Sequence, residues 1–457
     1  MLLNQKSQVA LLQTLNLIAN PTRFLETSLQ QQGDPFIVRV LGINSPPVVF
    51  FSRSQAIKEI FALPGDQFDF TKATHVFQPL MGDRSIVLQE GYSHQRQKQL
   101  MMPSFHGDRM KAYGDIISQI THDVAAKWSV GQTISLQHEM SEITLQIILQ
   151  VVFGISAGTR YDTIKALLSS LLDDVTTPWY SSLFFFPPLQ KDWGAWSPWG
   201  QFLRRRQAID QLIYSEIAQR KSEDYSHRTD ILSMLIAARD ENGQPMTDVE
   251  LRDQLVSLLL LGYETTAAAL AWAFYLIHAS PHVLSKLLQE LTVATTNPDA
   301  IASSSSYLTA ICQETLRIYP IGLICTPRMV KNSVQIDGQE FQPGTIIVPC
   351  IYLAHRQPEV YAQPEQFLPE RFLDRKFSPY EYLPFGGGIR GCIGAAFSMY
   401  EMKLVLAAIL SRFELALADA SRPVRPVRRG ITIVPSASGM KMVVKGQRQA
   451  VKIPAHR

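Results

Sequence analysis

One apolar stretch, residues 255–277, limits the folds open to this chain more than any other feature. Its 23 residues contain a single charged side chain, Glu264. By length the stretch could span a bilayer, but an acid at its centre would cost about 2.5–3.5 kcal/mol on insertion scales. Gly262, Thr265 and Thr266 lie beside that acid. The sequence therefore favours a long helix that is apolar on all sides because it is buried in a globular protein.

The composition is that of a globular protein with a large core. Of the 457 residues, 46% are hydrophobic and 18% charged, which excludes a disordered or fibrous chain. The net charge of +3 is too balanced to indicate a nucleic-acid partner. The four cysteines are widely spaced and form no zinc pattern. At this size we expect reduced thiols and a cytoplasmic setting.

The N-terminal stretch is a poor candidate for a membrane anchor. Gln13, Thr14 and Asn16 interrupt its apolar residues, so it makes a poor signal peptide and is too polar to span a bilayer. We expect no membrane anchor.

Residues 178–199 form an aromatic segment that has two interpretations. Four of the six tryptophans lie in it, at positions 179, 193, 196 and 199. The segment could be a satellite cluster beneath a long loop. It could instead be an apolar lip that touches a membrane or a lipophilic substrate.

Strand and helix signals are unevenly distributed along the chain. Alternating and β-branched runs are concentrated at about 34–70, 325–375 and 425–445. Helical periodicity dominates 90–320 and 392–412. Because the strands come from both ends of the chain, we expect one domain over residues 1–457, mainly α with a smaller β-rich region.

The clearest chemical motif is Phe385-Gly-Gly-Gly-Ile-Arg-Gly-Cys392-Ile-Gly394. A strongly helix-forming run follows it, so Cys392 lies at a helix N-terminus, where the dipole and free N–H groups favour a thiolate. The glycines leave room for a flat group against the backbone. Arg390 can reach a carboxylate.

This loop resembles the cysteine-ligand loop of the cytochrome P450 family, FxxGxRxCxG. Phe385, Gly388, Arg390, Cys392 and Gly394 match all five fixed positions. The resemblance implies haem b (iron protoporphyrin IX) with Cys392 as its axial thiolate ligand. It also implies a haem buried between the long central helix and the helix that follows the cysteine loop. Thiolate ligation favours O–O cleavage, so the expected activity is that of a monooxygenase.

Two further motifs precede that loop in the order typical of the family. Glu314-Thr-Leu-Arg317 places an acid and a base on one helix face. Pro369-Glu-Arg371-Phe follows it. By the resemblance, Glu314, Arg317 and Arg371 form a buried charge network that supports the proximal side of the haem, a structural rather than a catalytic role.

The polar residues of the long apolar helix resemble the family's acid–alcohol pair. A threonine can bond back to the carbonyl four residues earlier and open the helix slightly, and an adjacent carboxylate can relay protons. Glu264 would be the acid and Thr265 the alcohol. The sequence departs from the family at Leu261, where a small residue is usual, so we expect a narrowed pocket.

The segment around His94 resembles the family helix that holds the haem propionates. His94 fits the first position of that pattern. Lys98 occupies a position where Arg is usual, and Arg96 is an alternative donor. Arg328 and His355 are further candidates for propionate contacts.

The substrate pocket is assigned by resemblance alone. Its candidate lining residues, besides Thr265, are Phe77, Ile86, Val87, Leu261, Ile321, Leu323 and Ala437. Most are apolar, and the overall pattern is most similar to bacterial and cyanobacterial fatty-acid hydroxylases. We therefore expect a lipophilic substrate, a fatty acid or alkane being favoured, with terpenoids left open.

The catalytic fold accounts for the whole length, so the electrons are expected from a separate ferredoxin or flavodoxin. Arg96, Lys98, Arg109, Lys111 and Lys403 would lie on the proximal face and suit an acidic partner, or form a plain solvated surface. We expect a monomer. Alternatives are a peroxide-driven or isomerising relative of the same fold, a haem-binding sensor without turnover, and a helical protein without a cofactor.

Overall fold

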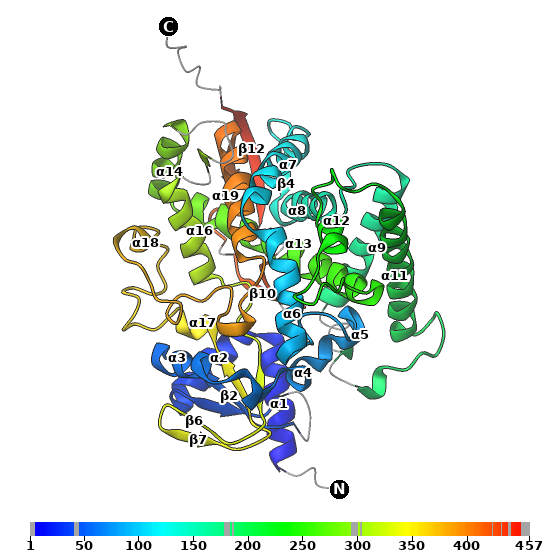
Figure 1. Ribbon diagram of the computed structural model, residues 1–457. Helices are drawn as coiled ribbons and strands as arrows, with labels where there is room; N and C mark the ends of the chain where they lie inside the picture. Colours follow the sequence, from blue (N-terminus) through cyan, green and yellow to red (C-terminus); the bar gives the residue numbers. More distant parts are fainter. Residues whose placement is uncertain are drawn as a thin grey trace.

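Helix α13 (Asp248–Ala279) runs through the middle of the molecule (Figure 1). The computed structural model describes residues 5–40, 45–177, 183–184, 187–293, 300–301, 304–422, 424–430, 432–436 and 440–448. Among these residues, α13 is the one helix long and apolar enough to cross a membrane, but 78% of its most apolar window is buried inside the protein. The burial supports the predicted core helix rather than a membrane span.

The N-terminus of α13 is held by a capping box. The Thr247 side chain accepts a hydrogen bond from the Glu250 backbone N–H, and the Glu250 carboxylate accepts one from the Thr247 N–H. These two bonds satisfy donors that a helix start leaves unpaired.

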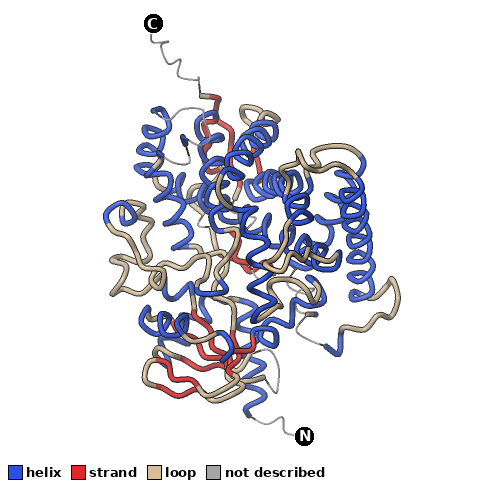
Figure 2. Tube along the Cα trace, viewed as in Figure 1, coloured by secondary structure: helices blue, strands red, loops and turns tan. Residues whose placement is uncertain are grey.

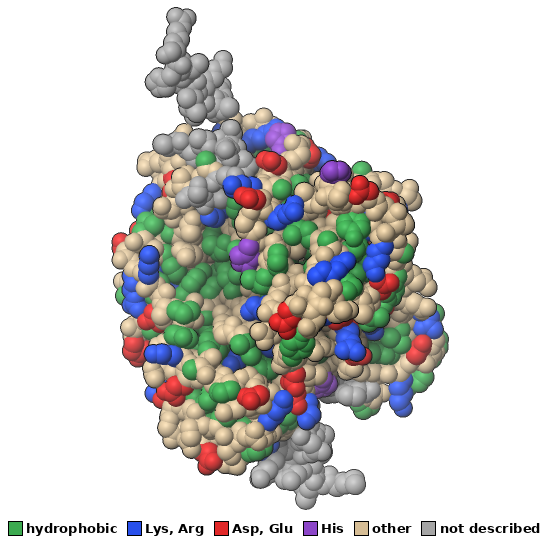
Figure 3. Space-filling view, in the orientation of Figure 1, with side chains coloured by type: hydrophobic (Ala, Val, Ile, Leu, Met, Phe, Trp, Pro, Cys, Tyr) green, Lys and Arg blue, Asp and Glu red, His purple; other side chains and the backbone are tan. Residues whose placement is uncertain are grey.

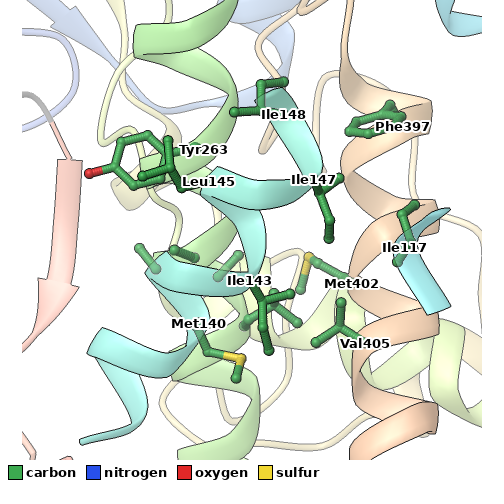
Figure 4. Close-up of a cluster of buried hydrophobic side chains, with 14 of the residues drawn as sticks. Ile117, Met140, Ile143, Leu145, Ile147, Ile148, Tyr263, Phe397, Met402 and Val405 are labelled. Atoms are coloured by element: carbon green, nitrogen blue, oxygen red, sulfur yellow. The ribbon is translucent and has the colours of Figure 1, made fainter. Parts of the chain in front are cut away.

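Two helices cover much of α13: α8 (Leu136–Phe153) and α19 (Ala395–Arg412). Figure 4 shows Ile143 and Ile147 of α8 near Met402 of α19 in the shared core. The mid-helix Gly262 lies where α8 approaches closely, since a Cβ there would be 2.9 Å from Ile148 Cδ1. Close helix packing therefore accounts for this glycine.

Further helices surround this central layer (Figures 1 and 2). They are α6 (Gly91–Met101), α7 (Asp108–Ala125), α9 (Thr159–Thr176), α11 (Pro198–Ser222), α12 (Ile231–Ala237), α14 (Pro281–Val293) and α16 (Ser306–Ile318). Shorter helices are α4 (Phe70–Thr74), α5 (Gln78–Met81), α17 (Ile351–Ala354) and α18 (Arg371–Asp374).

A five-stranded sheet joins the two halves of the chain. Its order is β1-β2-β8-β5-β3, and β2 pairs in parallel with β8 while the other pairs are antiparallel. The strands are β1 (Phe36–Val38), β2 (Val48–Phe51), β3 (Phe68–Asp69), β5 (Arg328–Val330) and β8 (Ile346–Pro349). Strands from early and late in the chain thus share one sheet.

Three smaller sheets complete the β structure. A three-stranded sheet has the order β4-β12-β9, and the hairpins β6-β7 and β10-β11 are separate. Their bounds are β4 (Thr133–Ser135), β6 (Val334–Ile336), β7 (Gln339–Phe341), β9 (Phe413–Leu417), β10 (Pro426–Arg429), β11 (Thr432–Pro435) and β12 (Lys441–Gln447).

The predicted fold class, mainly α with a smaller β-rich region, is confirmed. The sequence places the helices mainly in 90–320 and 392–412, and the structure has further helices before residue 90: α1 (Gln5–Ala19), α2 (Pro21–Gln32) and α3 (Ser54–Ala62). The sequence also predicts no strand at β4 or β9. These two strands lie on either side of β12, a pairing distant in sequence that local periodicity does not reveal.

Candidate active site

The cysteine loop is shaped by glycines and by one backbone bond. Cys392 N–H donates to the Phe385 carbonyl at 2.9 Å, which closes the loop. Gly386 and Gly388 have φ of 68° and 63°, in the left-handed region that favours glycine. A Cβ at Gly387 would overlap the Phe61 ring. The loop therefore requires small residues before the cysteine.

Cys392 differs from the other cysteines in its exposure. Cys312, Cys325 and Cys350 are buried, whereas Cys392 is accessible at the start of α19. Protein atoms nevertheless surround the sulfur closely, and this desolvation raises the pKa of the thiol, while the Gly394 backbone N–H and Lys98 lower it. The helix start assists the thiolate, as predicted, but desolvation is the larger effect. A cationic ligand such as a metal would favour the thiolate.

Glu314, Arg317 and Arg371 form one buried charge network. Arg317 donates to both carboxylate oxygens of Glu314, at 2.7 and 2.9 Å, and Arg371 Nε donates at 3.0 Å. The Glu314 and Arg317 side chains have no exposed surface. The Leu368 N–H also donates to Glu314, at 2.9 Å. This acid is therefore satisfied by two cations and a backbone amide.

A second group of basic residues lies near the cysteine loop. Burial, then Arg390 and Lys98, lower the pKa of His94 to about 4. Burial also lowers the pKa of Arg390 to about 10, with Arg328 adding to the shift and Glu90 opposing it. Lys98 Nζ donates to the Ile389 carbonyl at 3.2 Å. The structure thus brings together four of the predicted propionate contacts. We call them the cation cluster: the cations Lys98, Arg328 and Arg390 together with His94, whose lowered pKa leaves it neutral at pH 7.

The cation cluster has unused hydrogen-bond donors. Arg328 Nη1 donates to the Ile60 carbonyl at 3.3 Å, and Arg390 donates to the Ile86 and Gln89 carbonyls. Within the described part of the chain, the buried Nε atoms of both arginines have no hydrogen-bond partner. Buried cations with unsatisfied N–H groups suit an anionic group such as a carboxylate.

The acid and the alcohol of α13 occupy adjacent positions in an unbroken helix. Thr265 Oγ1 donates to the Leu261 carbonyl at 2.6 Å. The Glu264 side chain is 4% exposed, and its Oε1 lies 3.2 Å from Arg429 Nε. Arg429 belongs to the hairpin β10-β11, and its role is not evident from the sequence. The Arg–Arg pair before a hairpin glycine is the only signal that could have indicated it.

A second threonine links α13 to the helix that follows the cysteine. Thr266 Oγ1 and Ser398 Oγ are 3.2 Å apart, which joins α13 to the first turns of α19. The helix that carries the acid–alcohol pair is therefore in contact with the helix that follows Cys392.

Comparison with known proteins identifies the family. A family model described as "Cytochrome P450" matches residues 14–442. The chain belongs to the cytochrome P450 family. Among curated relatives, "Putative cytochrome P450 135B1" of Mycobacterium tuberculosis is 34% identical over 424 residues, which are 93% of this chain and 87% of the relative.

Solved structures show the same fold. The structure described as "Retinoic acid bound cyanobacterial CYP120A1" has a TM-score of 0.82 at 23% identity, covering 95% of this chain and 96% of that one. The haem domain of cytochrome P450DA has a TM-score of 0.82 at 21% identity, covering 96% of each chain. This P450 is therefore a haem monooxygenase whose cofactor is protoporphyrin IX haem held by a cysteine thiolate.

Two predicted propionate contacts lie outside the cation cluster. Arg96 is bound to Asp240, Glu250 and the Pro245 carbonyl, so its guanidinium is directed toward the start of α13. The His355 ring is fully buried and accepts the Leu383 N–H at 3.0 Å. Its backbone carbonyl binds Arg317, so it belongs with the buried charge network.

The predicted pocket residues separate into two groups. Phe77, Ile86, Val87 and Leu261 pack, partly buried, against the main core, which also contains Ile321. Leu323 packs instead against the core beside the five-stranded sheet. Ala437 lies outside the described residues.

The aromatic segment, residues 178–199, contains both buried and exposed tryptophans. Trp199 is buried against Phe184 and Phe202. Trp193 and Trp196 are 56% and 74% exposed and stack on each other. Trp179 lies outside the described residues.

The basic residues predicted to face a redox partner are only partly available. Arg109 and Lys111 are exposed. Arg96 is paired, and Lys403 is partly buried, which lowers its pKa. On the face shown in Figure 3, basic and acidic side chains are interspersed.

Replacing Glu314 by Ala should destabilise the holoenzyme by about 3–5 kcal/mol, because Arg317 would stay buried without its counter-ion. We expect less haem per protein and an earlier unfolding transition in denaturant. The control is Lys286→Ala, which removes an exposed ion pair with Glu370 and should cost no more than about 1 kcal/mol. Equal stability of the two variants would contradict a structural role for Glu314.

Proposed function

We propose that Cys392 is the axial ligand of the haem and that the cation cluster binds its propionates. The observation that carries this assignment is an accessible cysteine at a helix start, near buried arginines whose Nε atoms lack partners among the described residues. Phe385, Gly388 and Gly394 would shape the loop against the haem. When bound, the haem supplies the activation of dioxygen. α13 and the helix α19 that follows Cys392 would enclose this group and keep it from bulk water.

The proposed roles on α13 follow from the positions of its polar side chains. Thr265, which donates to the Leu261 carbonyl, is assigned to orient a proton toward the reacting oxygen. Glu264 is assigned to relay that proton, since its buried carboxylate is paired with Arg429, whose side chain is partly exposed to solvent.

For the substrate we propose a fatty acid or alkane, which would bind on the distal side of the haem and be hydroxylated there. Phe77, Ile86, Val87, Leu261 and Ile321 support an apolar pocket, because all five are apolar and belong to or pack against one core. The structurally similar cyanobacterial protein is described with retinoic acid, itself a lipophilic carboxylic acid. Members of the family typically take lipophilic substrates and electrons from a separate partner.

The setting of the enzyme is part of the same proposal. We infer a single catalytic domain over residues 1–457 that acts as a cytoplasmic monomer with a ferredoxin or flavodoxin as electron donor. Arg109 and Lys111 are the exposed cations that favour an acidic partner. The exposed side chains of Trp193 and Trp196 support a peripheral contact with a membrane or with a lipophilic substrate.

The reduced carbon monoxide difference spectrum tests the axial ligand. We expect a strongly red-shifted Soret band for the parent and its loss in Cys392→Ala, because the shift requires thiolate ligation of the haem iron. Cys312→Ala, which changes a fully buried thiol, should retain the band. An unshifted parent spectrum would mean another axial ligand.

Thr265→Ala tests the acid–alcohol assignment. Without the hydroxyl, proton delivery should fail more often, so electron consumption should become uncoupled from product formation, with a roughly 10–100-fold loss of product per electron. Turnover driven by peroxide should be much less affected. A variant that remains tightly coupled would contradict the role of Thr265.

Spectral titration with fatty acids tests the substrate class. Saturable type-I shifts are expected for long-chain acids, because an apolar chain that enters the distal side displaces water from the haem. The binding constants should vary with chain length, which is measured over a series from short to long acids. The absence of any shift across that series would eliminate fatty acids.

A further inference from the structure

The loop between α5 and α6 carries Ile86 and Val87, and a single glutamine of α13 binds it at two points. Gln254 Nε2 donates to the Arg84 carbonyl at 2.6 Å, and its Oε1 accepts the Ile86 N–H at 3.0 Å. The Gln254 side chain is fully buried. Its amide therefore pairs with this loop through one donor and one acceptor, as the backbone of a neighbouring strand would.

Two neighbours of Gln254 reinforce this attachment. The Asp253 carboxylate accepts the Arg84 N–H at 2.8 Å, and Ser257 Oγ lies 2.7 Å from Ser85 Oγ. Both serines are buried. Residues 253, 254 and 257 lie on one side of the helix, since their spacings of three and four residues match the helical repeat.

The loop is pressed closely against α13 at its start. Gly82 has φ of 88°, and a Cβ there would overlap the Asp253 carboxylate. No larger side chain fits at this point without displacement. The backbone of residues 82–86 is thus held against α13 by contact as well as by hydrogen bonds.

The cysteine loop holds the other side of the same segment. Arg390 donates to the Ile86 carbonyl at 3.2 Å and also to the Gln89 carbonyl. Ile86 is therefore bound through its N–H to α13 and through its carbonyl to the loop before Cys392. Its side chain has little freedom to move relative to either element.

We infer that Gln254 is a positioning residue that determines which ligands the distal side of the haem admits, acting through Ile86 and Val87. This inference rests on the proposed haem site. Gln254 is assigned no contact with haem or substrate. It fixes the position of two pocket residues, because an Arg84 carbonyl and an Ile86 N–H left without partners in the interior are costly.

The test uses the holoenzyme and two nitrogen ligands of haem iron that differ in bulk, imidazole and 4-phenylimidazole. In Gln254→Leu the loop loses both bonds, so the association rate of 4-phenylimidazole should rise about tenfold, while that of imidazole stays within about twofold. Amide hydrogen exchange should accelerate in residues 82–89. Gln254→Glu keeps the acceptor for the Ile86 N–H. Its association rate for 4-phenylimidazole should therefore lie between that of the parent and that of Gln254→Leu.

The matched control is Gln137→Leu, which removes another buried glutamine, in the first turn of α8. It should change neither association rate. The inference would be overturned if each ligand bound Gln254→Leu at the same rate as the parent and if hydrogen exchange in the loop were unchanged. An equal rise for both ligands would also overturn it, since a general loosening is not selective. If the parent binds neither ligand, the proposed haem site itself fails.

If Gln254→Leu does not retain haem, Ser257→Ala provides the same measurement with a smaller change. It removes one bond to the loop at Ser85. The association rate of 4-phenylimidazole should again rise more than that of imidazole. Parent-like rates in that variant, together with parent-like exchange in residues 82–89, would count against the inference.

Discussion

The burial of α13 on nearly all sides is the constraint on which the rest of this P450 depends. A helix without a polar face has to be covered by protein, and α8 and α19 supply much of that cover. Every polar side chain on the helix then needs a specific partner. Gln254 binds the loop before α6, Glu264 pairs with Arg429, and Thr265 bonds back to the helix. Gln254 and Glu264 therefore connect this helix to the loop before α6 and to the hairpin β10-β11.

Buried charge separates structural residues from proposed ligand-binding ones. Glu314 is surrounded by Arg317, Arg371 and a backbone amide, so the network is complete within the protein. Arg328 and Arg390 have aromatic neighbours and backbone carbonyls as partners, yet their buried Nε atoms have none in the described residues. Removing one member of a complete network leaves a buried charge unpaired, whereas an incomplete network can accept an anion from outside the chain. The same physical rule thus assigns the two sets of arginines to different tasks.

The loop of residues 82–89 links the two sides of the proposed haem site. Its backbone binds α13 through Gln254 and the cysteine loop through Arg390. Arg390 was predicted from its motif as a carboxylate contact, and in the structure it also holds the segment that carries Ile86. The cysteine loop and the loop of residues 82–89 therefore share one side chain. A displacement of one loop can reach the other through this contact.

The family, the fold class and the order of the motifs could be predicted from the sequence, because short patterns around Cys392, Glu314 and Glu264 combine residue types whose chemistry is local. The sequence also predicted the buried charge network and the four members of the cation cluster. Which of the candidates lie together depends on the tertiary structure. Arg96 and His355 are bound elsewhere, Leu323 packs by the sheet, and Arg429 reaches Glu264 from a distant hairpin. These outcomes depend on contacts between residues far apart in the chain, for which local spacing carries no signal.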